Sequence, residues 1–372
     1  MDSSGRVLSS LLVVVVLSMQ VLLVPVVTGL RPPAIYVFGD STLDVGNNNY
    51  LPGKDVARAN RSYYGIDFPG IPTGRFSNGY NTADCVAKSM GFGSSPPPYL
   101  SLLAPTTSSL LVLTALTTGV SYASGDAGIL DSTNAGKTIS LSRQVHYFKA
   151  TKEKMVSTLG SHAVDAILSK SIFLIGIGSN DMFVFSAAEQ QQQGDVAAFY
   201  ASLVSNYSAA IHELYKLGAR KFAIINVGLV GCVPRVRVLD AAAGACADAM
   251  NELAAGFDAA LEPMLARLAG KLPGMAYSLA DSFGLTQDAF ANPEASGYTD
   301  IAGACCGGGR LGAEADCQLG ATLCADRDRF LFWDRVHPSQ RAAMLSAKAF
   351  YDGPAQFTSP ITFKQLLAHK IF

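Results

Sequence analysis

Five short runs of the chain are apolar at both odd and even positions, unlike a strand with one face in water. They are rich in Val, Ile, Phe and Tyr. Strands that are buried on both faces, as in parallel sheets, have this composition. We therefore expect buried strands at residues 34–38, 119–123, 171–177, 221–227 and 275–279.

Two long stretches between these runs repeat their apolar residues every three or four positions. One covers Asp195 to Leu217 and ends before Gly218, and the other covers Cys246 to Leu268. An apolar stripe at that spacing is one face of a helix, and glycine commonly ends a helix. Strands and helices alternate without an obvious linker or repeat, which predicts one large doubly wound α/β domain.

The first 29 residues have the composition of a secretory signal peptide. Arg6 precedes an apolar run from Val7 to Val27, and small residues follow near Gly29. This order is typical of a cleaved signal. The alternative is a membrane anchor, because the run approaches the roughly 20 residues that cross a bilayer. Polar residues and a proline inside the run favour cleavage, so we expect a secreted domain of residues 30–372 without a membrane span.

Charge and sequons agree with this compartment. The formal net charge is −1, so no basic surface indicates a nucleic-acid partner. Sequons begin at Asn60 and Asn206, which are therefore candidate glycosylation sites. Because short sequons also arise by chance, they add only modest support for export.

Six of the seven cysteines lie in the second half of the chain, and export favours their oxidation. We expect Cys232 to pair with Cys246 and the other four to pair among themselves. The alternative is a metal site within the last four, but that region has no C-x-x-C pair, so we predict no metal. Cys85, in a predicted helix, should be a free buried thiol. The six are Cys232, Cys246, Cys305, Cys306, Cys317 and Cys324.

Polar, glycine-rich stretches follow four of the predicted strands. Ligands of open α/β sheets bind beyond the carboxyl ends of the strands, so these stretches should meet at one edge. Each stretch alone has a plainer interpretation as a turn, a flexible loop or a helix cap. In chain order they are G-D-S (39–41), S-G-D-A-G (124–128), G-S-N-D (178–181) and G-L-V-G-C (228–232).

Among the five histidines, His337 is the best candidate for a catalytic base. It follows Asp334 by three residues in F-W-D-R-V-H-P-S-Q. That spacing allows the carboxylate to hold Nδ1 of the imidazole and direct Nε2 towards a serine. Pro338 also favours extended backbone at His337. The alternative is a local Asp–His contact that opens a final helix over residues 339–351.

Five blocks of sequence stand in one order along nearly the whole chain after the signal peptide. They are F-G-D-S-T-L-D-V-G-N-N-N-Y (38–50), P-T-G-R-F-S-N-G (72–79), G-V-S-Y-A-S-G-D-A-G-I-L (119–130), G-I-G-S-N-D (176–181) and F-W-D-R-V-H-P-S-Q (332–340). Together they resemble the plant GDSL esterase/lipases, a branch of the SGNH hydrolases. The resemblance implies a flavodoxin-like fold, an α/β/α sandwich of three layers around a five-stranded parallel sheet.

The resemblance also implies the role of each site residue. Ser41 is the expected nucleophile, His337 its general base and Asp334 the residue that orients the imidazole. A serine hydroxyl is a poor nucleophile until a neighbouring base takes its proton. The oxyanion hole would combine the Ser41 N–H, a backbone N–H of the 119–130 block and the Asn180 side-chain amide.

The chain departs from the family pattern at three positions. The 119–130 block usually has Asn where this chain has Ser121, and a second glycine where it has Asp126. In the fourth stretch, Val230 stands where the family often has proline. A non-glycine residue at 126 must tolerate unusual backbone geometry. We therefore expect the Gly125 N–H to be the donor from this block.

The expected protein is a secreted serine hydrolase that acts on a small-molecule or lipid-like carboxylic ester without metal or organic cofactor. One alternative is an acyltransferase, which would discharge the same acyl-enzyme to an alcohol. Another is a catalytically silent binding protein. The run Met182–Phe185, just after Asn180, is either part of an apolar acyl pocket or ordinary helix packing.

Overall fold

The computed structural model describes residues 31–103, 110–189, 195–239 and 244–370. The predicted signal peptide lies outside the described residues. Within the described ranges, no helix combines the length and the apolar character that crossing a bilayer requires.

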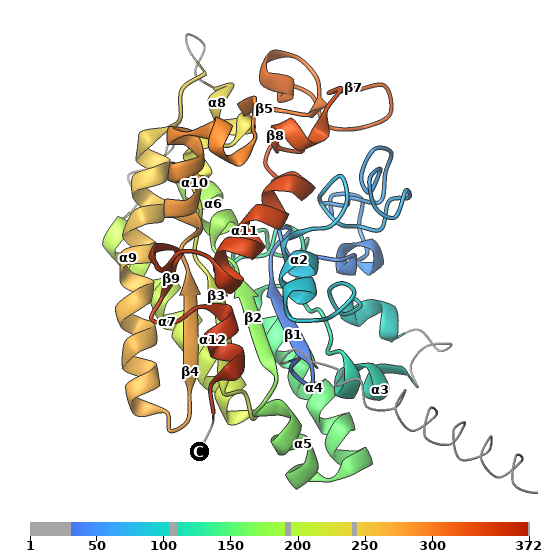
Figure 1. The fold of residues 1–372 in the computed structure, drawn as a ribbon, viewed down its shortest axis with the longest axis vertical. Coiled ribbons are helices and arrows are strands. Elements are labelled where there is room, and N and C mark those ends of the chain that lie inside the picture. Colours follow the sequence, from blue (N-terminus) through green and yellow to red (C-terminus); the bar gives the residue numbers. More distant parts are fainter. Residues whose placement is uncertain (1–30, 104–109, 190–194, 240–243, 371–372) are drawn as a thin grey trace, which may run out of the picture.

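A five-stranded sheet forms the centre of the molecule, in the order β1-β2-β3-β4-β9 (Figure 1). The first four strands are parallel and in register, with Val37 opposite Leu174, Leu174 opposite Ala223 and Ala223 opposite Ser278. All four are fully buried, which explains why the sequence shows apolar runs instead of alternation. The strands are β1 (Ile35–Gly39), β2 (Ile172–Gly176), β3 (Lys221–Ile225), β4 (Ala276–Ala280) and β9 (Thr358–Ser359).

The fifth strand is not the one that the sequence predicts. The run at 119–123 lies beside β1 and bridges Val37 through Ser121, but it forms no regular strand. On its other side it bonds to Pro97–Tyr99, whose two prolines cannot donate to a ladder. The fifth strand is β9, which pairs antiparallel with β4 and is too short to leave a pattern in the sequence. The α/β prediction is confirmed, with a sheet that is mostly parallel.

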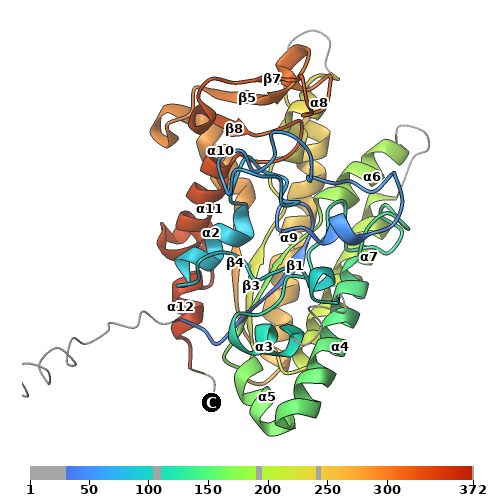
Figure 2. The same cartoon turned by 90° about the vertical axis from the view of Figure 1, so that its right-hand side faces the viewer.

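Helices cover both faces of the sheet (Figures 1 and 2). Tyr36 and Phe38 of β1 face a cluster built with α4, α5, α7 and α9, whereas Ile35 and Val37 face α2, α11 and α12. Successive side chains of a strand point to opposite faces, so each strand contributes to both layers. The helices are α2 (Thr82–Ser89), α3 (Leu110–Thr117), α4 (Leu141–Leu159), α5 (Ser161–Leu168), α6 (Ser179–Glu189), α7 (Val196–Lys216), α8 (Pro234–Arg237), α9 (Asp248–Lys271), α10 (Ser282–Ala291), α11 (Gln340–Asp352) and α12 (Phe363–Ala368). The 3-10 helices are η2 (Asn47–Tyr50), η3 (Tyr99–Leu102), η4 (Val230–Cys232), η5 (Pro293–Ser296), η6 (Arg310–Gly312), η7 (Arg327–Arg329) and η8 (Ala355–Phe357).

The predicted long helices are confirmed, and their ends have local causes. The Asp195 carboxylate accepts a hydrogen bond from the Ala198 N–H and caps α7. Gly218, with φ of 107°, turns the chain out of the same helix. The second predicted stretch is α9, and the final helix before the C-terminus is α11.

Three disulfides join the six late cysteines: Cys232–Cys246, Cys305–Cys324 and Cys306–Cys317. The first predicted pair is confirmed, and the other four cysteines do pair among themselves. Cys85 in α2 is free and buried as predicted, and burial raises the pKa of its thiol to about 12. Such a bonded set fits a chain of the secretory pathway. Asn60 in a loop and Asn206 in α7 are both exposed.

The two later disulfides belong to a small cluster beyond the carboxyl ends of the main strands. Buried Trp333 packs there with Tyr64, Phe76 and the bonded cysteines. Two minor sheets frame the cluster, one of β5 (Asp300–Ala304) with β8 (Phe330–Phe332) and one of β6 (Cys306–Gly307) with β7 (Thr322–Leu323). The segment that carries Asp334 and His337 therefore begins within this disulfide-bonded cluster.

Candidate active site

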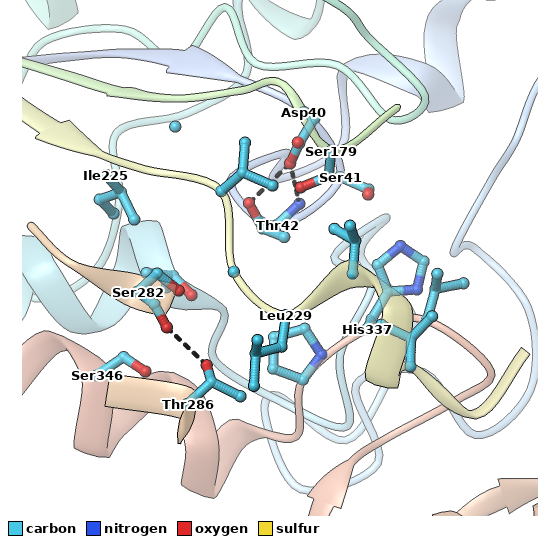
Figure 3. A pocket seen from close by; sticks show the side chains of 18 of the residues that line it. Asp40, Ser41, Thr42, Ser179, Ile225, Leu229, Ser282, Thr286, His337 and Ser346 are labelled. Atoms are coloured by element: carbon cyan, nitrogen blue, oxygen red, sulfur yellow. Dashed lines mark hydrogen bonds between the residues drawn. The ribbon is translucent and has the colours of Figure 1, made fainter. Parts of the chain in front are cut away.

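The polar stretches at the strand ends meet at one pocket, as the α/β topology predicts. Its volume is about 220 Å³, and Ser41, Asn180 and His337 all line it (Figure 3). Asp126 lines the pocket as well, whereas Gly125 does not. The G-L-V-G-C stretch contributes Gly228, Leu229 and Val230.

Ser41 lies in the first turn after β1. The Asp40 N–H donates to the Gly176 carbonyl, and the Asp40 carbonyl accepts from the N–H groups of Leu43 and Asp44, which closes the turn around Ser41. Gly39 permits this turn, because a Cβ there would lie 2.4 Å from the Gly176 oxygen. The Ser41 side chain is thereby held at the exit of the strand.

The asparagine-rich loop after Ser41 attaches the 119–130 block to the site. The Asp44 carboxylate accepts from the Gly125 N–H at 3.0 Å, and Asn47 donates to the carbonyls of Ser121 and Ala123. Asn48 donates to the Gly125 carbonyl and accepts from the Ser124 hydroxyl. No role was predicted for these polar side chains from the sequence. The available signal was the stretch rich in Asn and Gly that follows Ser41.

His337 is held by Asp334, the residue that the spacing predicted. Nδ1 lies 2.8 Å from both carboxylate oxygens, and the N–H groups of Val336 and His337 donate to Oδ1. The Tyr64 hydroxyl donates to Oδ2 at 2.7 Å, and the Phe76 ring lies 4.8 Å from the imidazole between centroids. Tyr64 was missed because its partner is 270 positions away and no local pattern connects them.

Charge and burial set the protonation of this pair. Burial opposes ionisation of Asp334, but the His337 charge and the hydrogen bonds outweigh it and lower the Asp334 pKa to about 2. Burial alone would lower the pKa of His337, yet the carboxylates of Asp334, Asp126 and Asp40 raise it above its ordinary value. The structure thus pairs an ionised Asp334 with an imidazole whose pKa is raised, and such a pairing is known from enzymes that use histidine as a general base.

The geometry speaks against Gly125 as the oxyanion donor from the 119–130 block. Its N–H is already engaged with Asp44. The next residue, Asp126, lines the pocket in the left-handed region with φ of 62°, and its N–H has no acceptor within the described residues. Aspartate tolerates this backbone region better than most residues, so the position keeps a glycine-like conformation without glycine. The Asn180 side-chain amide donates one hydrogen bond to the Ala127 carbonyl at 3.0 Å, and its second N–H remains available as a donor.

A family model described as GDSL-like Lipase/Acylhydrolase matches residues 35–350. The chain belongs to this family. The Arabidopsis thaliana protein GDSL esterase/lipase At5g55050 is 38% identical over 90% of this chain and 90% of its own length. A second from the same plant, GDSL esterase/lipase At4g16230, is 36% identical over 92% of this chain and 93% of its own length. The crystal structure of a catalytic mutant of an acetylxylan esterase from Geobacillus stearothermophilus covers 91% of this chain and 96% of that chain, with 11% identity and a TM-score of 0.37.

Membership of the GDSL family makes the protein a carboxylic ester hydrolase. Within the described residues, no group of three or more His, Cys, Asp or Glu side chains is placed to hold a metal ion. The pocket is lined by a serine and by a histidine that contacts a buried carboxylate.

The run after Asn180 contributes less to this GDSL-family pocket than its composition hinted. Phe183 lines the pocket, but Met182 is fully buried in the core. Val184 is 40% exposed, and Phe185 stacks on Phe199 with 4.0 Å between ring centroids. The run is therefore divided between pocket lining by Phe183 and helix packing by Met182 and Phe185, and an acyl-binding role for Phe183 stays a prediction.

Proposed function

We propose that the protein is an exported serine esterase, in which Ser41, His337 and Asp334 form the catalytic triad. The proposal rests on one contact, the 2.8 Å approach of His337 Nδ1 to Asp334 beside a pocket that Ser41 also lines. With Nδ1 bound in this way, Nε2 is left free to take the hydroxyl proton of Ser41.

The reaction has two balanced steps. Ser41 Oγ attacks the ester carbonyl while His337 takes the proton, and His337 then gives that proton to the departing alcohol. Water attacks the acyl-enzyme with the same base, which releases the carboxylic acid and restores Ser41. The oxyanion of each tetrahedral intermediate would accept hydrogen bonds from the N–H groups of Ser41 and Asp126 and from the Asn180 amide, without any cofactor.

The export part of the proposal concerns residues 1–29 as a cleaved signal peptide and 30–372 as the mature domain. Three disulfides and the exposed sequons at Asn60 and Asn206 support it. N-terminal sequencing and glycan mapping of the protein secreted from a plant or insect host would test both features.

The catalytic proposal is tested with the Ser41→Ala and Asp334→Asn variants of the mature protein. Hydrolysis of 4-nitrophenyl esters and labelling by a fluorophosphonate would be followed together. Ser41→Ala should abolish both, and Asp334→Asn should lower turnover by about 10⁴-fold through the wrong imidazole tautomer. Unchanged turnover in folded Ser41→Ala protein would remove Ser41 from the mechanism.

Two other experimental outcomes would favour a function other than ester hydrolysis. Labelling of Ser41 with little hydrolysis, but ester formation on an added alcohol, would identify an acyltransferase. Neither labelling nor turnover in folded wild-type protein would identify a silent binding protein.

A further inference from the structure

The pocket extends well beyond the catalytic groups. From Ser41 and His337 it passes along the strand ends towards α10 and α11, where Ser282, Thr286 and Ser346 lie (Figure 3). Buried apolar side chains form much of its wall over this length, and Asn226, whose Oδ1 accepts from the Ser282 N–H, lies among them. The apolar side chains include Ile177, Ile225, Val227, Leu331, Phe332 and Phe350.

Hydroxyl groups interrupt the apolar wall at the end distant from Ser41. Ser282 and Thr286 lie together, since a Cβ at Gly228 would be 3.2 Å from Ser282 Oγ and 3.8 Å from Thr286 Oγ1. Ser346 stands between Ala342 and Phe350 at four-residue spacing on α11, and all three line the pocket. We call Ser282, Thr286 and Ser346 the hydroxyl end of the pocket.

These hydroxyls have hydrogen-bonding capacity to spare. Thr286 donates to the Ser282 carbonyl at 2.7 Å and keeps its lone pairs free. Within the part of the chain that the structure describes, the Ser282 and Ser346 hydroxyls have no protein partner. An alkyl group against them would strip their water and leave them unsatisfied, which disfavours a plain hydrocarbon end.

Charge further limits what this end can receive. The charged or titratable side chains of the pocket are Asp40, Asp126, Arg235 and His337. Asp40 adjoins Ser41, and Asp126 interacts electrostatically with both His337 and Arg235, so all four belong to the catalytic end. The hydroxyl end therefore suits a neutral donor or acceptor and not a carboxylate or an ammonium group. Arg235 is exposed at the catalytic end, and we assign this end to the leaving alcohol.

We propose that the preferred substrate carries a hydroxylated acyl group, apolar along its length and bearing a neutral hydroxyl at its distal end, which binds Ser282, Thr286 and Ser346. This inference rests on the proposed function, because the acyl group is the part that Ser41 retains. The hydroxyl end determines specificity and takes no part in bond making or breaking.

The test compares two series of 4-nitrophenyl esters of equal chain length, one of plain alkanoic acids and one of ω-hydroxyalkanoic acids. At the chain length that reaches the hydroxyl end, kcat/KM should favour the hydroxylated ester by about tenfold or more, since a polar site discriminates against an analogue that leaves it unpaired. In Ser282→Ala/Ser346→Ala protein the ratio should fall towards one. Ser205→Ala, an exposed serine of α7, is the matched control and should keep the wild-type ratio.

A second variant guards against misfolding of the double mutant. Gly228→Ala places a methyl group 3.2 Å from Ser282 Oγ and should lower the ratio of kcat/KM for hydroxylated over plain esters. If wild-type protein hydrolyses both series without a preference at any chain length, the inference is overturned and the esterase proposal stands. A preference that persists in both variants would also overturn the inference. If folded wild-type protein hydrolyses none of the esters, both proposals are overturned.

Discussion

The Asn180 side chain offers a sharp test of the oxyanion hole. It lies on the first turn of α6 and lines the pocket. One amide hydrogen is committed to the Ala127 carbonyl at 3.0 Å, which fixes the plane of the amide. The second hydrogen is the one that could meet a developing oxyanion.

Replacing Asn180 with alanine should cost about 10²- to 10³-fold in kcat, or about 2.7–4 kcal/mol of transition-state stabilisation. KM should change little, because the bond strengthens only as negative charge develops on the substrate oxygen. The lost bond to Ala127 should lower the free energy of unfolding by only about 0.5–1.5 kcal/mol, so the variant remains folded. Asn180→Asp should be at least as damaging, since a carboxylate cannot donate and repels the oxyanion.

The assay is steady-state hydrolysis of a short 4-nitrophenyl ester, with equilibrium denaturation of each variant in parallel. Ser179→Ala, a neighbouring pocket residue, is the control and should retain turnover within a few-fold. A loss in Asn180→Ala smaller than about tenfold, or a loss confined to KM, would refute the donor role and reduce Asn180 to a structural link with Ala127.

Two further predictions concern the pH dependence of kcat/KM and the disulfide-bonded cluster around Trp333. Burial lowers the pKa of His337, but nearby carboxylates, including Asp126, raise it above its ordinary value. The imidazole must be neutral to act as a base. Asp126→Asn should therefore move the acid limb of the pH–kcat/KM profile to lower pH, and a shift to higher pH would contradict this. Removing the Cys305–Cys324 disulfide, whose cysteines are 19 positions apart, should lower the free energy of unfolding by about 3 kcal/mol in chemical denaturation. Turnover should fall as well, because the Cys305 N–H donates to the Phe332 carbonyl of β8, which leads to Asp334. Full activity in the Cys305→Ala/Cys324→Ala variant would contradict this coupling.

Local patterns were sufficient where the structure depends on neighbours in sequence. Four buried strands, the helices α7, α9 and α11, and the Asp334–His337 contact were all predictable, because each follows from spacing along a short segment. The departure at Asp126 was also visible in the sequence, but its consequence was not. Choosing between the N–H groups of Gly125 and Asp126 required the position of Asp44, a residue far away in the chain.

The sequence by itself determined the family, the α/β class, the first disulfide and the candidate triad, since motif order and periodicity are properties of the chain alone. Only the tertiary structure decided that β9 completes the sheet, that Tyr64 holds Asp334 and that the pocket ends in hydroxyl groups. Each of these depends on which distant segments approach one another. Such approaches are set by the packing of whole layers, where many weak contacts add up, and no short stretch of sequence carries that sum.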